Sequence, residues 1–154
     1  MTAPAHALTG ALIGLSISNP AIALPLAVAS HFVCDVIPHY DEAEQDTVKR
    51  ISSRRFWIEF VAVSAGLCFL IVLALAMAHP KHWFTAALCA FLATSPDAFW
   101  LRRFLHARRT GTDIRLNAFL RFHEAIQWKT GPKLIWVEVI WLVGMTLLII
   151  PKLA

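Results

Sequence analysis

Histidines and aspartates at helical spacing are the residues of this chain that could do chemistry. His31, Asp35 and His39 form the pattern HxxxDxxxH in the segment SHFVCDVIPHYD. With about 3.6 residues per turn, His31 and Asp35 share one face of a helix, and Pro38 ends that helix before His39. Imidazole nitrogens together with a carboxylate oxygen are typical ligands of zinc, manganese or iron. The pattern therefore predicts a divalent metal site.

Further ionisable side chains come from other parts of the chain. His6 lies near its start, Asp97 follows a proline in SPDAFW, and His123 and Glu124 occur in RFHEAIQW. Asp97 is a further candidate ligand, while His6 and His123 suit either a ligand or a general acid–base role. Glu124 is a candidate catalytic carboxylate. Together with the HxxxDxxxH residues, this set is large enough to hold two ions.

A carboxylate within an apolar run is another candidate. Glu138 lies in WVEVIW, inside the apolar run 134–150. A charged side chain in the middle of a membrane costs at least ~2.5 kcal/mol unless it is partnered, so Glu138 is not expected to face lipid. A catalytic role, support of a metal ligand and pairing with an arginine are the alternatives for this residue.

The composition indicates an integral membrane protein. Of the 154 residues, 58% are hydrophobic and 16% are charged, and the mean hydropathy is +0.61. A soluble domain is about 45–50% apolar and about 25% charged, so a soluble enzyme, a disordered chain and a disulfide-rich secreted module are excluded. The net charge of +4 does not indicate a nucleic-acid partner, because the basic residues occur in short clusters between apolar runs.

Membrane helices must position these side chains. The predicted fold class is all-α: a polytopic transmembrane bundle of about five membrane helices and one cytoplasmic interfacial helix, forming a single domain over 1–154. The turn signal SISNP favours a hairpin of two helices in the first apolar stretch over one span. We expect membrane helices near 3–18, 20–37, 56–79, 82–101 and 132–150, and the interfacial helix near 113–128.

Basic residues predict the orientation of this bundle. With the hairpin, the N-terminus and the segments 39–55 and 102–133 share one side, which carries twelve of the fourteen lysines and arginines. Lys81 and Lys152 lie on the other side. The positive-inside rule makes the basic side cytoplasmic, so we expect a multi-pass protein of the inner membrane. The candidate ligands then meet at the cytoplasmic face.

Three motifs resemble a known family. The segments PAHALTGALIGL and ASHFVCDVIPHYD and the Pro-Asp of SPDAFW are similar to the membrane-bound metal-dependent hydrolases, and HxxxD is more distantly similar to zinc-dependent phospholipase C. Many members carry a further motif of the Arg-Gly-x-Thr-His type, which this sequence lacks, and RFHEAIQW is the segment suited to replace it. The resemblance implies a metal site formed by His6, His31, Asp35, His39 and Asp97.

Two functions fit these residues. The first is a hydrolase of a phosphoester or lipid ester, in which a divalent metal, zinc before manganese or iron, activates water and polarises the substrate. Its partners would be membrane lipids, with the arginines of 102–109 suited to hold a phosphate. The second is a non-enzymatic membrane protein that binds or carries metal, or a structural bundle. A carrier should place polar groups near the midplane and on both sides, whereas the ionisable residues crowd one face here.

Overall fold

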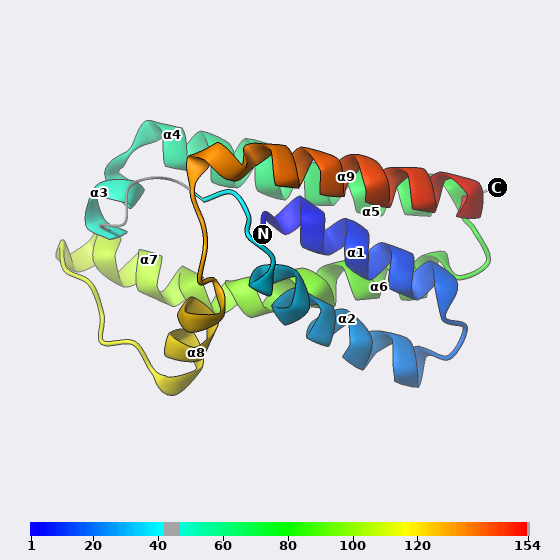
Figure 1. The fold of residues 1–154 in the computed structure, drawn as a ribbon, viewed down its shortest axis with the longest axis horizontal. Helices are drawn as coiled ribbons and strands as arrows, with labels where there is room; N and C mark the ends of the chain where they lie inside the picture. Colours follow the sequence, from blue (N-terminus) through cyan, green and yellow to red (C-terminus); the bar gives the residue numbers. More distant parts are fainter. Residues whose placement is uncertain (42–46, 154) are drawn as a thin grey trace.

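The computed structural model of this chain describes residues 1–41 and 47–153. Their regular elements are helices (Figure 1). Within these residues no β-strand forms, and an isolated backbone bridge joins His39 to Thr130. The predicted all-α class is therefore confirmed. Residues 42–46, part of the polar segment 39–55, lie outside the described residues.

The break predicted by SISNP separates the first two helices. α1 (Ala3–Ser16) ends at the first residue of this segment and α2 (Pro20–Val36) begins at its last, and both helices end slightly before the predicted ends at 18 and 37. The Asn19 side chain caps α2 by accepting a hydrogen bond of 3.0 Å from the Ala21 amide. The following proline supplies the first helical residue, where its missing N–H costs nothing.

The second half of the bundle contains the longer apolar helices. They are α5 (Gly66–Ala78), α6 (Trp83–Thr94) and α9 (Ile135–Ile149). The predicted helix near 56–79 is assembled from α4 (Arg54–Trp57), the π-helical η1 (Ile58–Ala65) and α5, and the short α3 (Thr47–Ser52) precedes it. The predicted helix near 132–150 is α9 flanked by the 3-10 turns η3 (Pro132–Leu134) and η4 (Ile150–Lys152).

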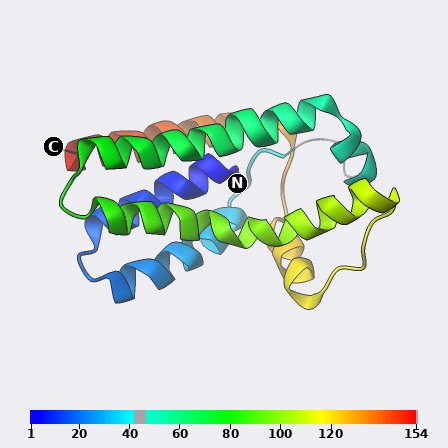
Figure 2. The ribbon, with the colours of Figure 1, turned by 180° about the vertical axis from the view of Figure 1, so that it is seen from behind.

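α1 lies at the centre of the bundle, against α2, α5, α6 and α9 (Figures 1 and 2). Small residues allow this close packing. A Cβ added at Gly10 would lie 2.3 Å from the Cys89 carbonyl oxygen of α6, and one added at Gly14 would lie 2.4 Å from Ala86 Cα. Gly10 and Gly14 thus form a GxxxG pair that joins α1 to α6 at backbone contact.

The helix expected to end near residue 101 continues to residue 110. α6 passes through the 3-10 turn η2 (Ser95–Asp97) directly into α7 (Ala98–Thr110), so the arginine-rich segment is helical. Arginine, leucine and alanine are good helix formers, and Pro96 sits at the start of a turn, where its ring is tolerated. Gly111, with a φ of 67°, ends α7 in the left-handed conformation.

The interfacial helix expected near 113–128 is shorter than predicted. α8 (Ala118–Ile126) begins after Asn117, whose side chain accepts a hydrogen bond of 2.9 Å from the Leu120 amide. Asp113 lies outside the helix because its carboxylate binds the Arg103 guanidinium of α7. The amphipathic part of the segment is helical, and the stretch before it is a connection.

Among the described residues, two helical stretches are long and apolar enough to cross a membrane, rather than about five. They are Trp83–Thr110 and Pro132–Lys152, and Pro20–Val36 and Val63–Ala78 are shorter apolar helices. For the first of the predicted helices the difference arises from length, because the 14 residues of α1 span about 21 Å, less than the ~30 Å hydrocarbon core. Large apolar side chains nevertheless cover the outer surface of the bundle, among them Phe69, Phe91 and Leu147.

Candidate metal centre

Five ionisable side chains from four elements meet at one end of the bundle. His6 comes from α1, His31 and Asp35 from α2, Asp97 from η2 and His123 from α8. We call them the His/Asp cluster. The side chains of its three histidines and of Asp35 are fully buried, whereas the Asp97 side chain is 35% exposed. Of the six residues predicted to converge, these five do so in two groups, and His39 lies outside both.

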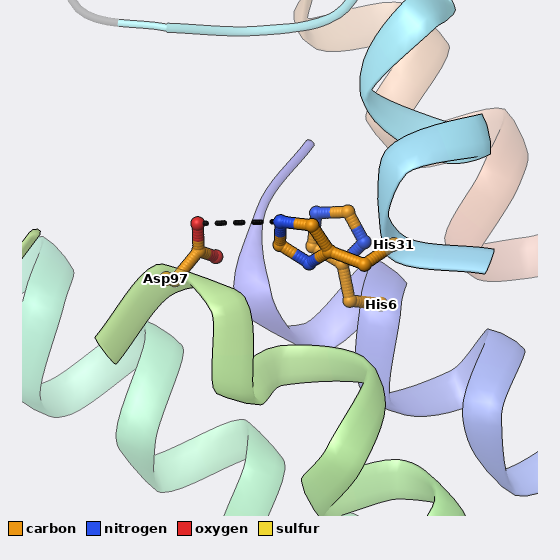
Figure 3. A group of neighbouring side chains, drawn as sticks. All are labelled: His6, His31 and Asp97. Carbon is orange, nitrogen blue, oxygen red and sulfur yellow. Dashed lines mark ion pairs between the residues drawn. The ribbon is translucent and has the colours of Figure 1, made fainter. Parts of the chain in front are cut away.

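One part of the cluster consists of His6, His31 and Asp97 (Figure 3). One ligand atom from each residue lies within 4.8 Å of the others. The two imidazole rings stack with centroids 4.1 Å apart, and Asp97 faces them from η2, with its Oδ1 3.6 Å from His31 Nε2. The turn at Pro96 thus brings a carboxylate from a different helix toward two adjacent imidazoles.

The other part consists of His31, Asp35 and His123. Asp35 Oδ2 lies 2.8 Å from His123 Nε2 and 3.2 Å from His31 Nε2, and the two histidine nitrogens are 2.9 Å apart. His31 belongs to both parts and therefore links them. The one-turn spacing of His31 and Asp35 on α2 supplies this pair, as the sequence predicted.

Hydrogen bonds distinguish the roles of His31 and His123, two of the three histidines that lie beside Asp35. His31 Nδ1 lies 2.8 Å from the Ala93 carbonyl oxygen, which can only accept, so Nδ1 carries a proton and neutral His31 presents a lone pair at Nε2. The Trp100 indole N–H donates to His123 Nδ1 over 3.2 Å, so neutral His123 carries its proton on Nε2. His31 is therefore arranged as a metal ligand and His123 as a hydrogen-bond donor to Asp35.

His6 provides a test of whether a metal fits this cluster. Its side chain is fully buried, its Nδ1 has no hydrogen-bond partner within the described residues, and its Nε2 lies 3.1 Å from Asp35 Oδ1. A buried polar group without a partner costs about 1–3 kcal/mol, and coordination of a metal ion by a ring nitrogen offsets that cost. The distances of 3.1–3.6 Å from His6 and His31 to the neighbouring carboxylates also match the ~3.3 Å between ligands of a tetrahedral zinc ion. The residues present therefore fit a divalent metal.

Asp35 receives more donors than the sequence pattern predicted. The N-terminal amine of Met1 pairs with Oδ1, and Gln127 Nε2 donates to Oδ2 over 3.1 Å. Sequence reasoning missed Gln127 and Trp100 as parts of the site. Gln127 lies four residues after His123, and this helical spacing could have predicted that its amide belongs to the site. The sequence holds no such signal for Trp100, whose position indicates only an aromatic residue near the end of a span.

His39 and Glu124 lie outside the two metal-binding groups. His39 is buried, and its Nδ1 donates to the Ile37 carbonyl oxygen over 2.7 Å. Burial, together with the nearby N-terminal amine, lowers the pKa of His39, so its imidazole is neutral at pH 7. The Glu124 side chain is 58% exposed and lies 4.0 Å from the Arg103 guanidinium. The roles predicted for them, metal ligand for His39 and catalytic carboxylate for Glu124, therefore stay predictions.

Glu138 lies apart from the cluster and supports the start of α1. Its Oε2 accepts a hydrogen bond of 2.8 Å from the Thr2 hydroxyl, and its Oε1 accepts one of 3.2 Å from the Thr2 amide. A carboxylate at a helix N-terminus interacts favourably with the helix dipole. Of the three alternatives for Glu138, this arrangement favours support of a metal ligand, because Glu138 holds the start of α1, the helix that carries His6.

The Glu138→Ala variant is expected to lower the free energy of unfolding by about 2 kcal/mol, because it leaves the Thr2 amide and hydroxyl without their charged acceptor. Thermal unfolding in detergent, followed by tryptophan fluorescence, measures the loss. Glu124→Ala is the matched control and should stay within about 0.5 kcal/mol of wild type, because that side chain is exposed. Equal stability of the two variants would contradict the supporting role.

A cavity of about 510 Å³ opens beside the cluster, and we call it the polar cavity. Asp97 lines it, as do His39, Glu124 and the guanidinium-bearing residues Arg50 and Arg103. A molecule in the polar cavity can reach the cluster at Asp97. Two arginines are suited to an anionic group, because the guanidinium binds phosphate or carboxylate through paired hydrogen bonds.

No family model, curated protein or solved structure matches this chain. The support for a function therefore comes from the residues of the His/Asp cluster, their hydrogen bonds and the polar cavity beside them.

Proposed function

We propose that this protein is a membrane-bound metal-dependent hydrolase that acts on a phosphoester or a lipid ester. The observation that carries the proposal is the His/Asp cluster: side chains from four elements meet beside a cavity, and the buried His6 Nδ1 lacks a hydrogen-bond partner within the described residues. Zinc is the proposed ion, because imidazole and carboxylate ligands at these separations suit its tetrahedral coordination, with manganese or iron as alternatives. The resemblance of three sequence motifs to membrane-bound metal-dependent hydrolases supports the same activity.

In this proposal the residues of the cluster divide their roles. His6, His31, Asp35 and Asp97 hold the ion, which when bound polarises the substrate and lowers the pKa of a water molecule toward ~7. His123 holds a proton on Nε2 beside Asp35, and Gln127 fixes the same carboxylate. His123 is therefore the candidate general acid–base group. Arg50 and Arg103 orient an anionic substrate in the polar cavity.

We further propose that the chain is a multi-pass protein of the inner membrane with its site facing the cytoplasm. Two helical stretches are long enough to span, and α2 and α5 are shorter apolar helices. Large exposed apolar side chains on α5, α6 and α9 support contact of these helices with lipid. With local thinning of the bilayer, α1 and α2 form a hairpin, and the arginines of α7 lie on the cytoplasmic side.

Metal content and hydrolysis test the proposed function together. Purified protein is expected to hold stoichiometric zinc, manganese or iron by mass spectrometry and to hydrolyse bis(p-nitrophenyl) phosphate, p-nitrophenyl esters or phospholipids. Removal of metal with a chelator should lower the rate at least tenfold, and the missing ion should restore it. Protein without stoichiometric metal would overturn the proposal. Bound metal without hydrolysis of any of these substrates would instead favour a protein that binds or carries metal.

A further inference from the structure

Three neighbouring cavities along the bundle share lining residues. The polar cavity shares residues such as Arg50 and Phe56 with a second cavity of about 640 Å³. The second cavity shares Pro4, Leu67 and Leu142 with a third of about 390 Å³. Because each cavity has walls in common with the next, we treat them as one feature, the long groove.

The long groove runs over α1 between α5 and α9. In its inner part the floor is α1, with Leu8, and the two walls are α5, with Ile71, and α9, with Ile149. α1 packs against both of these helices, and the two views agree that it lies next to them (Figures 1 and 2). Both walls are apolar helices, and α9 belongs to a stretch that can span a membrane.

The chemistry of the groove changes from one end to the other. At the end near the His/Asp cluster it is lined by charged and amide side chains, including Asp97, Arg103 and Gln127. At the far end the lining is almost entirely hydrocarbon, as with Leu75 and Leu153. A ligand that fits the whole groove must have a polar head and a long apolar tail, as a lipid does.

Arginines give the polar part of the groove its affinity for an anion. Arg50 and Arg55 line the second cavity, and Arg50 and Arg103 line the first. Arg50 already donates to Asp41 and Arg103 to Asp113. A guanidinium has five N–H donors, so Arg103 can bind a phosphate oxygen in addition to Asp113, and Arg50 and Arg55 add positive charge at the same end. A divalent ion in the cluster would add further positive charge at the same end.

We propose that the long groove binds one acyl chain of a bilayer phospholipid and places its phosphate between the metal centre and the arginines. This inference rests on the proposed hydrolase and names phospholipid as its substrate class. The wall formed by residues 135–153 is about 27 Å long, enough for a chain that spans one leaflet of about 15 Å. In this position hydrolysis forms a P–O bond to the oxygen of water and breaks the P–O ester bond to the leaving alcohol, whose oxygen receives a proton from that water.

Tryptophan substitutions that fill the groove test this inference. Leu67 and Val139 line the second cavity from opposite walls, so Leu67→Trp and Val139→Trp should block the apolar tail. Ile140→Trp is the matched control, because Ile140 is the next residue of α9, is 63% exposed and does not line any of the three cavities. Metal content confirms that each variant retains the fold of the cluster.

Native mass spectrometry of purified, metal-loaded protein measures the binding of palmitoyl-oleoyl phosphatidylglycerol, with dihexanoyl phosphatidylglycerol as a short-chain probe. We expect the wild type and Ile140→Trp to bind one long-chain lipid, and the two groove variants to bind it at least tenfold more weakly. The affinity for the short-chain probe should differ far less between the wild type and the variants, because its tails are too short to fill the groove. Equal binding of the long-chain lipid by groove variants and control would overturn the inference.

Hydrolysis assays distinguish a failure of the groove inference from a failure of the proposed hydrolase function. A wild type that binds the lipid through the groove but hydrolyses neither lipid nor bis(p-nitrophenyl) phosphate supports the groove and overturns the hydrolase. A wild type that hydrolyses the soluble phosphodiester but does not bind the long-chain lipid supports the hydrolase and overturns the groove.

Discussion

The His31→Gln variant is expected to lose stoichiometric metal, with affinity reduced by about 100-fold or more. His31 is the residue shared by the two metal-binding groups, and its Nδ1 bond to the Ala93 carbonyl leaves the Nε2 lone pair directed at the cluster. Glutamine keeps a polar side chain in the same buried place but offers an amide, which is a poor ligand for zinc. Metal content after purification and titration of the apo protein with zinc measure the loss.

His39→Gln is the matched control for this prediction. His39 is also a buried histidine, but its side chain lies outside the two metal-binding groups. The sequence motif predicts a ligand at both positions, whereas the geometry favours His31. We therefore expect His39→Gln to keep most of the bound metal. Loss of metal in both variants to the same extent would restore the full HxxxDxxxH motif as the ligand set, and retention in both would contradict a centre built on His31.

The helical fold could be predicted from the sequence because its signals are local. An apolar run with few charges predicts a helix wherever it occurs, and Asn19 with its following proline marks the break between α1 and α2. Two helix ends differ from the prediction: α7 continues to residue 110, and α8 begins only at residue 118. Asp113, in the connection between them, is held by a tertiary contact with Arg103 that the sequence pattern does not indicate. The number of spans was also overestimated, because composition identifies apolar segments but does not fix helix length.

The candidate site was predictable in its residue types and less so in its detail. His31 and Asp35 are brought together by helix periodicity, which can be read from the sequence. His6 and His123 join them through the packing of α1 and the position of α8, and helix periodicity places neither beside Asp35. Trp100 determines the proton position on His123 through a contact between residues far apart in the chain. Such contacts depend on tertiary structure, which spacing alone does not define.

The packing of α1 that brings His6 to the cluster leads to the second large prediction. Gly10→Ala is expected to lower the free energy of unfolding by about 3 kcal/mol. Its new Cβ would lie 2.3 Å from the Cys89 carbonyl oxygen and 2.7 Å from Ala93 Cβ, so α1 and α6 would have to separate. His6 lies one turn before Gly10 on the same face of α1, so we also expect weaker zinc binding.

Gly144→Ala is the control that separates this clash from the general effect of adding a methyl group to a helical glycine. A Cβ at Gly144 in α9 meets no atom within 4 Å, so the variant should gain up to about 1 kcal/mol from helix propensity. Thermal unfolding in detergent should therefore move in opposite directions for the two variants, and zinc titration should weaken only for Gly10→Ala. A Gly10→Ala protein as stable as the Gly144→Ala protein would show that α1 does not approach α6 at backbone contact, and the position of His6 in the cluster would then be wrong.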